Sequence, residues 1–183
     1  VGSNFNVILE RTVRELRGQP CITTNNFMEP KKQIMVSRSF GRSITSKKIL
    51  SEAISFHASR AAEKLRHESQ KCRIITAFIR SNRFNNNIKQ IYASRHIELA
   101  YPTDDSRIII KNANQILNSV FMDGYQYSKA GVLLSDFTKS YGYQMSLFDK
   151  NIDSKSSREL MRTVDHINMM EIARIGFGNQ GFI

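Results

Sequence analysis

The chain has 183 residues, 40% hydrophobic and 23% charged, with a formal net charge of +11. This composition fits a soluble globular protein of one or two small domains. No apolar run approaches the roughly 20 residues that span a bilayer, and residues 1–20 lack a signal-peptide pattern, so we expect a cytoplasmic chain without a membrane partner. Residues 1–100 hold 18 Lys or Arg against 7 Asp or Glu, and the remainder holds 9 against 9. This basic half predicts a polyanionic partner, most often nucleic acid; the alternative is charge that serves solubility alone.

The first predicted element is a helix over residues 5–17. Its apolar residues recur at helical spacing, and Glu10 with Arg14 makes an i,i+4 pair. Gly-Gln-Pro at 18–20 ends the helix, and the polar residues 21–31 are interpreted as a linker.

Four strands and two helices are predicted in the next part of the chain. Strands are indicated by alternation of apolar and polar residues, and the first helix by an apolar face running from Leu50 to Leu65. The predicted ranges are a strand over 32–40, a helix from 45 or 46 to 68, strands over 72–80 and 95–101, a helix from 102 to 123, and a strand over 127–137.

The resulting order is β-α-β-β-α-β over residues 32–137. It predicts an α+β fold of the ferredoxin-like, split type, with one four-stranded sheet and two helices on one face. An N-terminal helix and a flexible C-terminal tail complete the prediction. The second face of the sheet would be open, and an open face on a basic sheet suits nucleic acid.

The stretch SRSFG, residues 37–41, offers hydroxyl, guanidinium and backbone amide donors, which grip phosphates without reading bases; a strand end that is simply polar is the alternative. In KAGVLL the alternation turns Lys129 and Gly131 outward, with the glycine leaving room for a backbone. The candidate DNA contacts are Ser37, Arg38, Ser39, Arg42, Arg80, Arg83 and Lys129.

Signals for catalysis or metal binding are weak. Asp104 and Asp105 are adjacent, but both suit the first turn of a helix, where negative charge is favoured. The G-x-G-x-x-G match at 176–181 has too little chain after it to open a helix. Cys21 and Cys72 form no C-x-x-C motif, so neither a disulfide nor a zinc site is expected. We predict no catalytic residue, no metal ligand and no cofactor.

The segment QMSLFD, residues 144–149, places apolar side chains between polar, turn-forming neighbours. Exposed apolar residues reduce solubility, so this cluster indicates a docking peptide.

Taken together, SRSFG, SRAAEKLR at 59–66, YPTDDSR at 101–107, YSKAGVLLSDF at 127–137 and QMSLFD resemble the C-terminal part of the UmuC-type bacterial polymerases. These are Y-family, error-prone translesion DNA polymerases of the SOS response, and plasmid-borne MucB-type members share the same stretches. The resemblance covers essentially the whole chain.

The resemblance implies a domain order. Residues 1–20 would be the last helix of the thumb, 21–31 a linker, 32–137 the little finger DNA-binding domain, and 138–183 a tail. The palm with its metal-binding carboxylates, and the fingers, would precede this chain. Polymerisation and its Mg²⁺ would therefore belong to the parent protein, and this part would hold primer-template duplex DNA.

QMSLFD resembles the sliding-clamp-binding motif of bacterial polymerases. By that resemblance Gln144 would hydrogen-bond at the rim of a pocket, Leu147 and Phe148 would fill an apolar groove, and Met145 would occupy a smaller site beside it.

A helix is also predicted over residues 156–170, with Leu160, Val164, Ile167 and Met170 on one face. The resemblance implies UmuD′ and RecA as partners of this tail, and the alternative is a helix that packs back on its own domain. For the chain as a whole, the second candidate function is a freestanding ferredoxin-like RNA-binding module. Such modules place aromatic residues on the outward face of their central strands, whereas the strands predicted here present mainly aliphatic and basic residues outward.

Overall fold

The computed structural model describes residues 6–21, 30–139, 155–170 and 175–181. It divides into two compact units, Val1–Lys31 and Lys32–Ile183. Within the first unit, helix α1 (Val7–Leu16) begins at Asn6, whose side chain accepts a hydrogen bond from the Ile8 amide. The predicted N-terminal helix is confirmed, and its chain turns at Gly18, where φ is +80°.

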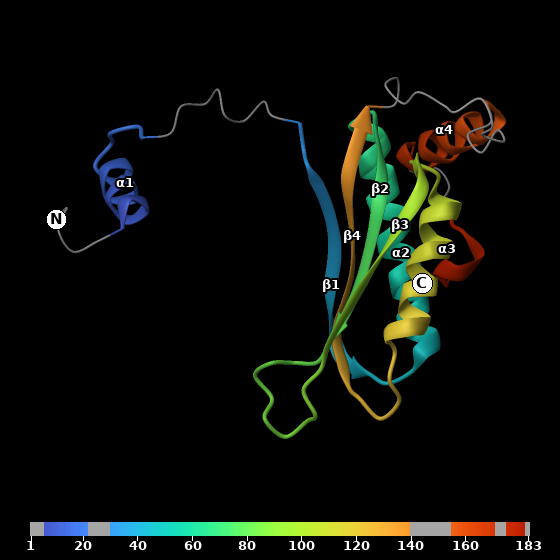
Figure 1. The fold of residues 1–183 in the computed structure, drawn as a ribbon, viewed down its shortest axis with the longest axis horizontal. Coiled ribbons are helices and arrows are strands. Elements are labelled where there is room, and N and C mark those ends of the chain that lie inside the picture. The colour runs from blue at the N-terminus through green and yellow to red at the C-terminus, as the bar shows by residue number, and fades with distance from the viewer. Residues whose placement is uncertain (1–5, 22–29, 140–154, 171–174, 182–183) are drawn as a thin grey trace. The chain divides into compact units, whose positions relative to one another are not determined.

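The second unit is built on a four-stranded antiparallel sheet (Figure 1). Its strands are β1 (Gln33–Ile44), β2 (Gln70–Arg80), β3 (Tyr92–Thr103) and β4 (Tyr127–Lys139), in the spatial order β1-β4-β2-β3. Because β4 is antiparallel to both of its neighbours, β1 and β2 run parallel with β4 between them. This is the split β-α-β arrangement that the sequence predicted.

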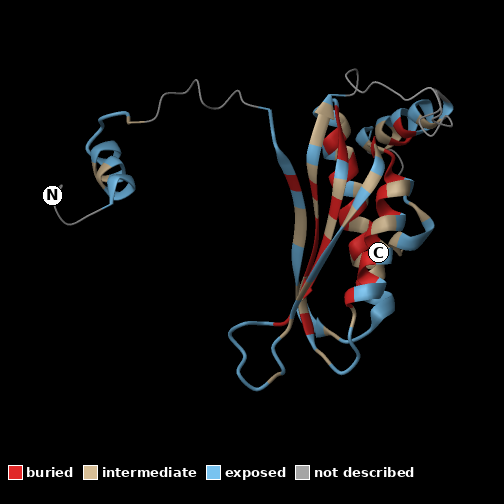
Figure 2. Cartoon of the chain, viewed as in Figure 1, coloured by how far each residue is buried: buried red, intermediate tan, exposed pale blue. Residues whose placement is uncertain are grey.

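Helices α2 (Lys47–His67) and α3 (Ser106–Val120) cover one face of the sheet, and the buried residues lie between the two layers (Figure 2). The predicted inner face of α2 is confirmed, since Leu50, Ile54, Ala58 and Leu65 are all 0% exposed. Burial of such side chains stabilises the fold by about 1.5–3 kcal/mol for each large aliphatic group. The α+β fold class is therefore confirmed, with the second sheet face left open.

Several element boundaries differ from the prediction; among them, β1 continues to Ile44 instead of ending at residue 40. Strand β3 has 12 residues and starts at Tyr92 rather than at residue 95. Helix α3 starts at Ser106 rather than at residue 102, because Thr103 still pairs with Cys72 in the sheet. Asp105 then forms the N-cap, accepting a hydrogen bond from the Arg107 amide at 2.8 Å.

Part of the predicted tail is packed on the domain. Helix α4 (Lys155–Met169) buries Met161 and Val164. Asp165 accepts two hydrogen bonds of 2.6 Å from the Arg66 guanidinium of α2. The predicted apolar face of this helix included Leu160, which is 44% exposed, so that prediction was wrong in part. Of the two alternatives for this helix, packing on its own domain is the one observed.

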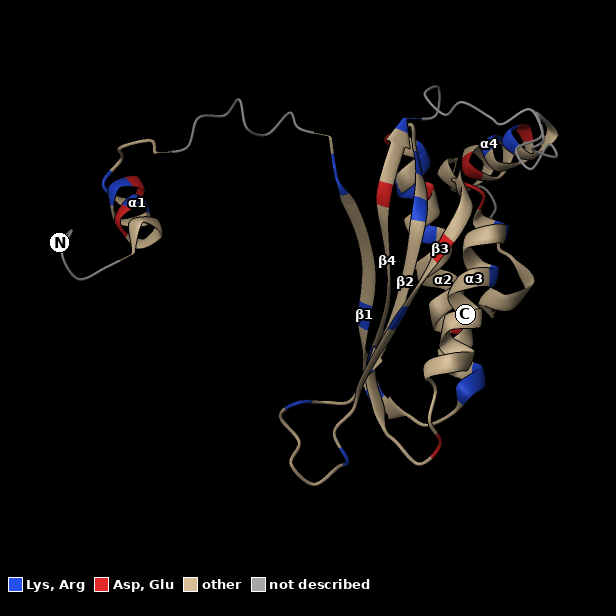
Figure 3. Cartoon of the chain, in the orientation of Figure 1, with Lys and Arg blue, Asp and Glu red and all other residues tan. Residues whose placement is uncertain are grey.

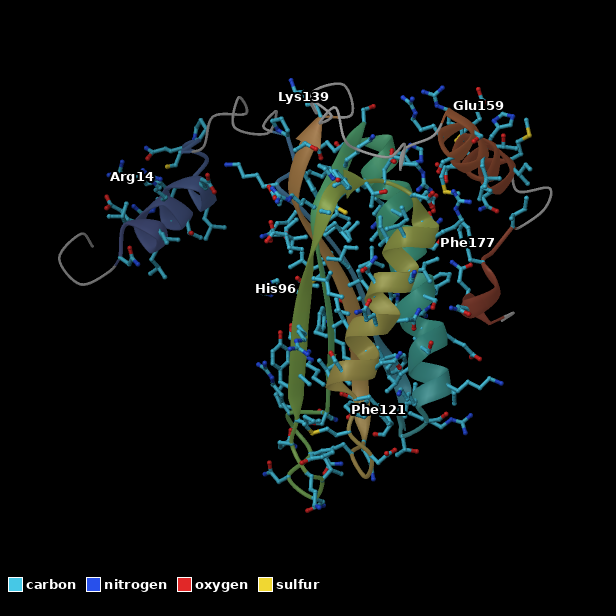
Figure 4. The ribbon with its side chains drawn as sticks, turned by 45° about the vertical axis from the view of Figure 1, so that its right-hand side comes forward. Arg14, His96, Phe121, Lys139, Glu159 and Phe177 are labelled. Atoms are coloured by element: carbon cyan, nitrogen blue, oxygen red, sulfur yellow. The ribbon has the colours of Figure 1, made fainter. Side chains whose placement is uncertain are left out.

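The C-terminal segment also returns to the helical layer. Its short 3-10 helix η2 (Gly178–Gln180) lies against α2, and the preceding Phe177 packs on the core (Figure 4). Within the described part of the chain, no helix is long and apolar enough to cross a membrane.

Candidate nucleic-acid interface

The open face of the sheet can be assigned residue by residue from the strand register. Successive strand residues alternate between the two faces, and directly opposed residues on neighbouring strands share a face. Ala130 and Val132 of β4 are fully buried beneath the helices, so Lys129, Gly131 and Leu133 belong to the open face. Figure 4 shows His96 of β3 pointing away from the helices in the same way.

One row of this face is basic, and Figure 3 shows Lys and Arg residues along the strands and in the loop that joins β2 to β3. Ser39, Lys129, Arg80 and Tyr92 lie opposite one another across β1, β4, β2 and β3. Directly opposed residues stand about 4.5–5.5 Å apart at Cβ, and like charges at that separation repel. Neither Lys129 nor Arg80 forms an ion pair with any described residue. This row therefore carries two adjacent cations whose charge nothing described in the protein compensates.

The connection between β2 and β3, residues 81–91, extends this row beyond the sheet (Figure 1). Its base is closed by Ser81, whose Oγ accepts from the Ile91 amide at 2.8 Å. Gln90 donates to two backbone carbonyls of the loop, at 3.0 and 2.7 Å. The loop so closed presents Arg83 to solvent, and Phe84 is 94% exposed.

A hollow of about 390 Å³ lies between the row and the loop. It is lined by Ser39, Phe40, Arg80, Ser81, Asn82, Arg83, Phe84 and Ser128. The fold thus brings the predicted contact Ser39 together with Arg80 and Arg83, which follow it by about forty residues, and places Lys129 in the adjoining row. We call these four residues the basic corner.

The next row is neutral and closely packed. Ser37, Gly131, Phe78 and Ser94 oppose one another across the four strands. A Cβ on Gly131 would lie 2.5 Å from both the Phe78 ring and the Ser37 Cβ. The space beside this glycine, which was expected to admit the backbone of a ligand, is therefore filled by the Phe78 ring.

Arg38 and Arg42 stand apart from the basic corner. Arg38 opposes the buried Ala130, so its side chain leaves β1 on the helix side. There it lies near His57 of α2, whose pKa is lowered by burial and, to a smaller degree, by the Arg38 charge. Arg42 is exposed, in the stretch where the pairing of β1 with β4 is irregular.

Aromatic residues on the open face were missed by the sequence interpretation. Phe78 and Tyr92 both lie there, with ring centroids 6.4 Å apart, so the expectation of mainly aliphatic and basic residues outward was wrong in part. Phe78 is 9% exposed and Tyr92 61%. For Tyr92 a signal was available, because the apolar residues Ile91, Ala93, Ile97 and Leu99 occupy alternate positions on one face and extend β3 beyond residue 95.

The docking residues Gln144, Met145, Leu147 and Phe148 lie outside the described residues. Within the described ranges, no group of three or more His, Cys, Asp and Glu residues lies together in a way that could hold a metal ion.

Comparison with known proteins gives consistent matches. The family model described as the impB/mucB/samB family C-terminal domain matches residues 31–147. Protein ImpB of Salmonella typhimurium is 45% identical over 183 residues, covering 99% of this chain and 43% of ImpB. Protein UmuC of Salmonella typhimurium strain LT2 is 44% identical over 168 residues, 92% of this chain and 40% of UmuC. The chain thus spans less than half the length of these curated relatives.

Among solved structures, the chain is similar to one in a complex of a beta-clamp processivity factor with the little finger domain of PolIV. The TM-score is 0.43 with 12% sequence identity, and the match covers 64% of this chain and 99% of that chain.

Proposed function

The chain belongs to the impB/mucB/samB family C-terminal domain, and from this we propose that it is the DNA-holding part of a translesion polymerase. In this proposal the basic corner grips the phosphate backbone of primer-template duplex in DNA repair and SOS mutagenesis. Nucleotide transfer and the Mg²⁺ it needs would belong to a palm domain elsewhere in the parent protein. The isolated chain should then show no primer extension above a contaminant control, with or without magnesium.

The observation that carries this proposal is the uncompensated charge of Arg80 and Lys129 on the open face. Opposed cations repel one another, and an external polyanion relieves that repulsion. The hydroxyl of Ser39 and the guanidinium of Arg83 add donors of the kind that contact phosphate. Such contacts release counterions, so they give affinity without reading sequence.

The same face argues against the second candidate, an RNA-binding module that stacks bases on its central strands. Phe78 is the aromatic residue on central strand β2, and its ring fills the space beside Gly131 instead of facing solvent. Tyr92 is exposed but lies on the edge strand β3. A base would find little free aromatic surface at the centre of this sheet.

Fluorescence anisotropy with a short labelled duplex tests the proposal. The double variant Arg80→Ala/Lys129→Ala should lower the slope of log affinity against log salt by about 1.8 units, since each B-DNA phosphate contact contributes about 0.9. Arg60→Ala/Lys64→Ala removes the same charge from an exposed face of α2 and should change the slope little. Equal losses in both variants would show diffuse attraction only, and a tenfold preference between unrelated duplexes would contradict backbone gripping.

We also propose that QMSLFD docks on the sliding clamp through Leu147 and Phe148, with Gln144 and Met145 beside them. The support is the motif itself, which follows the last residue of β4, Lys139, by a few residues. Leu147→Ala/Phe148→Ala should weaken clamp binding by about 1–3 kcal/mol for each anchor and leave the melting temperature unchanged. A large drop in melting temperature with unchanged clamp binding would mean that these residues pack on the domain instead.

Contact of the tail with UmuD′ and RecA stays a proposal as well. Leu160 and Met169 of α4, and Met170 directly after it, are exposed apolar residues, and they are the described part of the tail available to such a partner.

A further inference from the structure

The loop between β2 and β3 exposes an aromatic side chain that the proposed phosphate contacts do not use. Phe84 is 94% exposed, more than any other large apolar side chain that the structure describes. A single exposed apolar residue is common on protein surfaces, so its surroundings decide whether it marks a site. Phe84 borders the hollow of about 390 Å³ beside the basic corner.

Hydrogen bonds within the loop hold the backbone around Phe84. The amide of Phe84 donates to Asn82 Oδ1 at 3.0 Å, and the amide of Asn87 donates to Asn85 Oδ1 at 3.0 Å. Local bonds of this kind, from backbone to Asn side chain, stabilise turns. Gln90 Nε2 donates to the carbonyls of Asn82 and Asn85, on either side of Phe84. A ligand that contacts the ring therefore binds a loop that is already ordered, which lowers the entropy cost of binding.

The hollow combines three kinds of chemical group. Phe84 and the partly buried Phe40 supply apolar surface, and Arg80 and Arg83 supply guanidinium groups. The amide Nδ2 of Asn82 has no hydrogen-bond partner among the described residues, and none of the described residues that line the hollow is acidic. Proteins bind unpaired nucleotides with this set of groups: an aromatic face for the base, a polar side chain for its edge and cations for its phosphate.

We propose that this hollow binds one unpaired nucleotide next to duplex DNA, with its base stacked on Phe84 and its phosphate at Arg83. This binding rests on the proposed function, since the basic corner has to hold the adjoining duplex. Arg80 lines the hollow and also lies beside Lys129 in the basic row, so a strand that leaves a duplex held at the corner can reach the ring at once. Bases within a duplex are stacked on their neighbours, so the ring is available only to a base that is unpaired.

Two other uses of Phe84 are less well matched to its surroundings. An apolar wedge that kinks a duplex has to enter between stacked base pairs, whereas Phe84 borders a hollow that leaves space for a base on the protein side. A protein partner would cover an apolar patch, whereas the hollow beside Phe84 is lined mainly by polar and basic residues. An unpaired nucleotide uses both the ring and the groups around it.

Anisotropy with two labelled DNAs and the full chain of 183 residues tests this site. One DNA is a duplex with a short 5′ tail of thymines, and the other is a blunt duplex with the same number of phosphates. The wild type should bind the tailed duplex about fivefold more tightly or better, since stacking of one base contributes at least about that factor. Phe84→Ala should remove this preference and leave the affinity for the blunt duplex within about twofold, because a paired base does not reach the ring. Phe84→Leu keeps an apolar side chain without a flat ring and should lose the preference as well.

Two control variants separate the hollow from the rest of the second unit. Met169→Ala removes an apolar side chain that is 69% exposed on α4, at the opposite end of this unit (Figure 1), and should leave the preference unchanged. Lys129→Ala should weaken the binding of both DNAs alike, because Lys129 belongs to the basic corner and is not among the residues that line the hollow.

A fluorescent variant reports on the site directly. The chain contains no tryptophan, so the indole of Phe84→Trp is a single reporter, and the tailed duplex should quench it more than the blunt one. Absence of the preference from the wild type would overturn the proposal, and so would its survival in Phe84→Ala. Survival in Phe84→Leu alone would indicate a wedge, and unchanged binding of both DNAs in Phe84→Ala would leave the ring to a protein partner; both results also overturn it. A Lys129→Ala variant that binds both DNAs as tightly as the wild type would instead contradict the proposed function.

Discussion

Arginine residues have different roles at the two ends of the sheet of the second unit. At the basic corner, Arg80 and Lys129 stand together on an open face, without an acidic partner among the residues that the structure describes. At the other end, Arg66 is 11% exposed and is bound by Asp165, Ser106 and the Asp104 carbonyl. A charged side chain that is removed from water destabilises the fold unless it is paired. A charged side chain that stays in water can remain unpaired until a ligand binds. Burial therefore separates the arginine that holds the fold from the arginines that we expect to bind DNA.

The largest expected effect is at the paired end. Arg66→Ala should lower the free energy of unfolding by about 2–4 kcal/mol, because it leaves a partly buried carboxylate and a carbonyl without their donor. Urea unfolding measures this loss, and hydrogen exchange should show faster exchange throughout α4. Arg60→Ala, which breaks only an exposed pair with Glu63, should cost no more than about 1 kcal/mol. Similar costs for the two variants would remove the contrast between the ends.

The second prediction concerns the packed row beside the basic corner. Gly131→Ala should destabilise the domain by about 1–3 kcal/mol, because the added methyl group meets the Phe78 ring and the Ser37 Cβ at 2.5 Å. Adding Phe78→Leu should recover part of the loss. Gly41→Ala on β1 is the control, since a Cβ there meets nothing within 4 Å, and it should stay within about 0.5 kcal/mol of the wild type. Thermal melts that rank the two glycine variants equally would contradict this packing.

A third prediction compares two arginines of the DNA-contact set. Arg80→Ala should weaken duplex binding by about five- to tenfold, roughly 1–1.4 kcal/mol, because Arg80 lies on the open face. Arg38→Ala should weaken it by less than about twofold, because Arg38 lies on the helix side of β1. Anisotropy titrations at one salt concentration decide the matter, and an equal loss in both variants would mean that the DNA reaches around the edge of the sheet.

The smallest expected effect is a pH dependence at His57. This side chain is 4% exposed, and both ring nitrogens lack a hydrogen-bond partner among the described residues. Burial, with a smaller contribution from Arg38, lowers its pKa in the folded state. The unfolded chain therefore takes up the proton first, so the free energy of unfolding should begin to fall as the pH drops below about 6.5, and stop falling below the folded-state pKa.

The variant His57→Leu tests that dependence. Its free energy of unfolding should fall less than that of the wild type between neutral pH and about pH 5, as measured by urea titrations. An identical fall in both proteins would mean that other groups control the acid response.

The order of strands and helices could be predicted because apolar periodicity is a local signal. The faces of α2 and β4 follow from spacing alone, and both are buried as expected. The ends of strands and helices that depend on strand pairing could not be predicted from the neighbouring sequence. Thr103 stays in the sheet because of Cys72, which precedes it by about thirty residues, and α3 therefore begins only after Asp105.

The geometry of the candidate site could not be predicted from the sequence. The sequence singles out cationic and hydroxyl side chains as candidate DNA contacts, but strand register decides which of them lie together. Arg38 and Ser39 are neighbours in sequence, and alternation sends them to opposite faces. The ion pair of Asp165 with Arg66 could not be predicted from the sequence either, because no pattern within α4 indicates that a polar residue attaches the helix to the domain.

The docking of α4 has a consequence for the chain that carries the QMSLFD motif. Residue Lys139 ends a strand in the centre of the sheet, and Ser157 near the start of α4 is hydrogen-bonded to Asp105 at 2.6 Å. Figure 4 shows Lys139 and Glu159 at the same end of the domain. The described residues on both sides of the motif therefore belong to one folded unit, so the sequence that carries the motif is tethered to that unit at both ends. Its effective concentration beside the domain is limited by the number of residues between the two attachment points, so a clamp that captured the motif would be held within that chain length of the sheet.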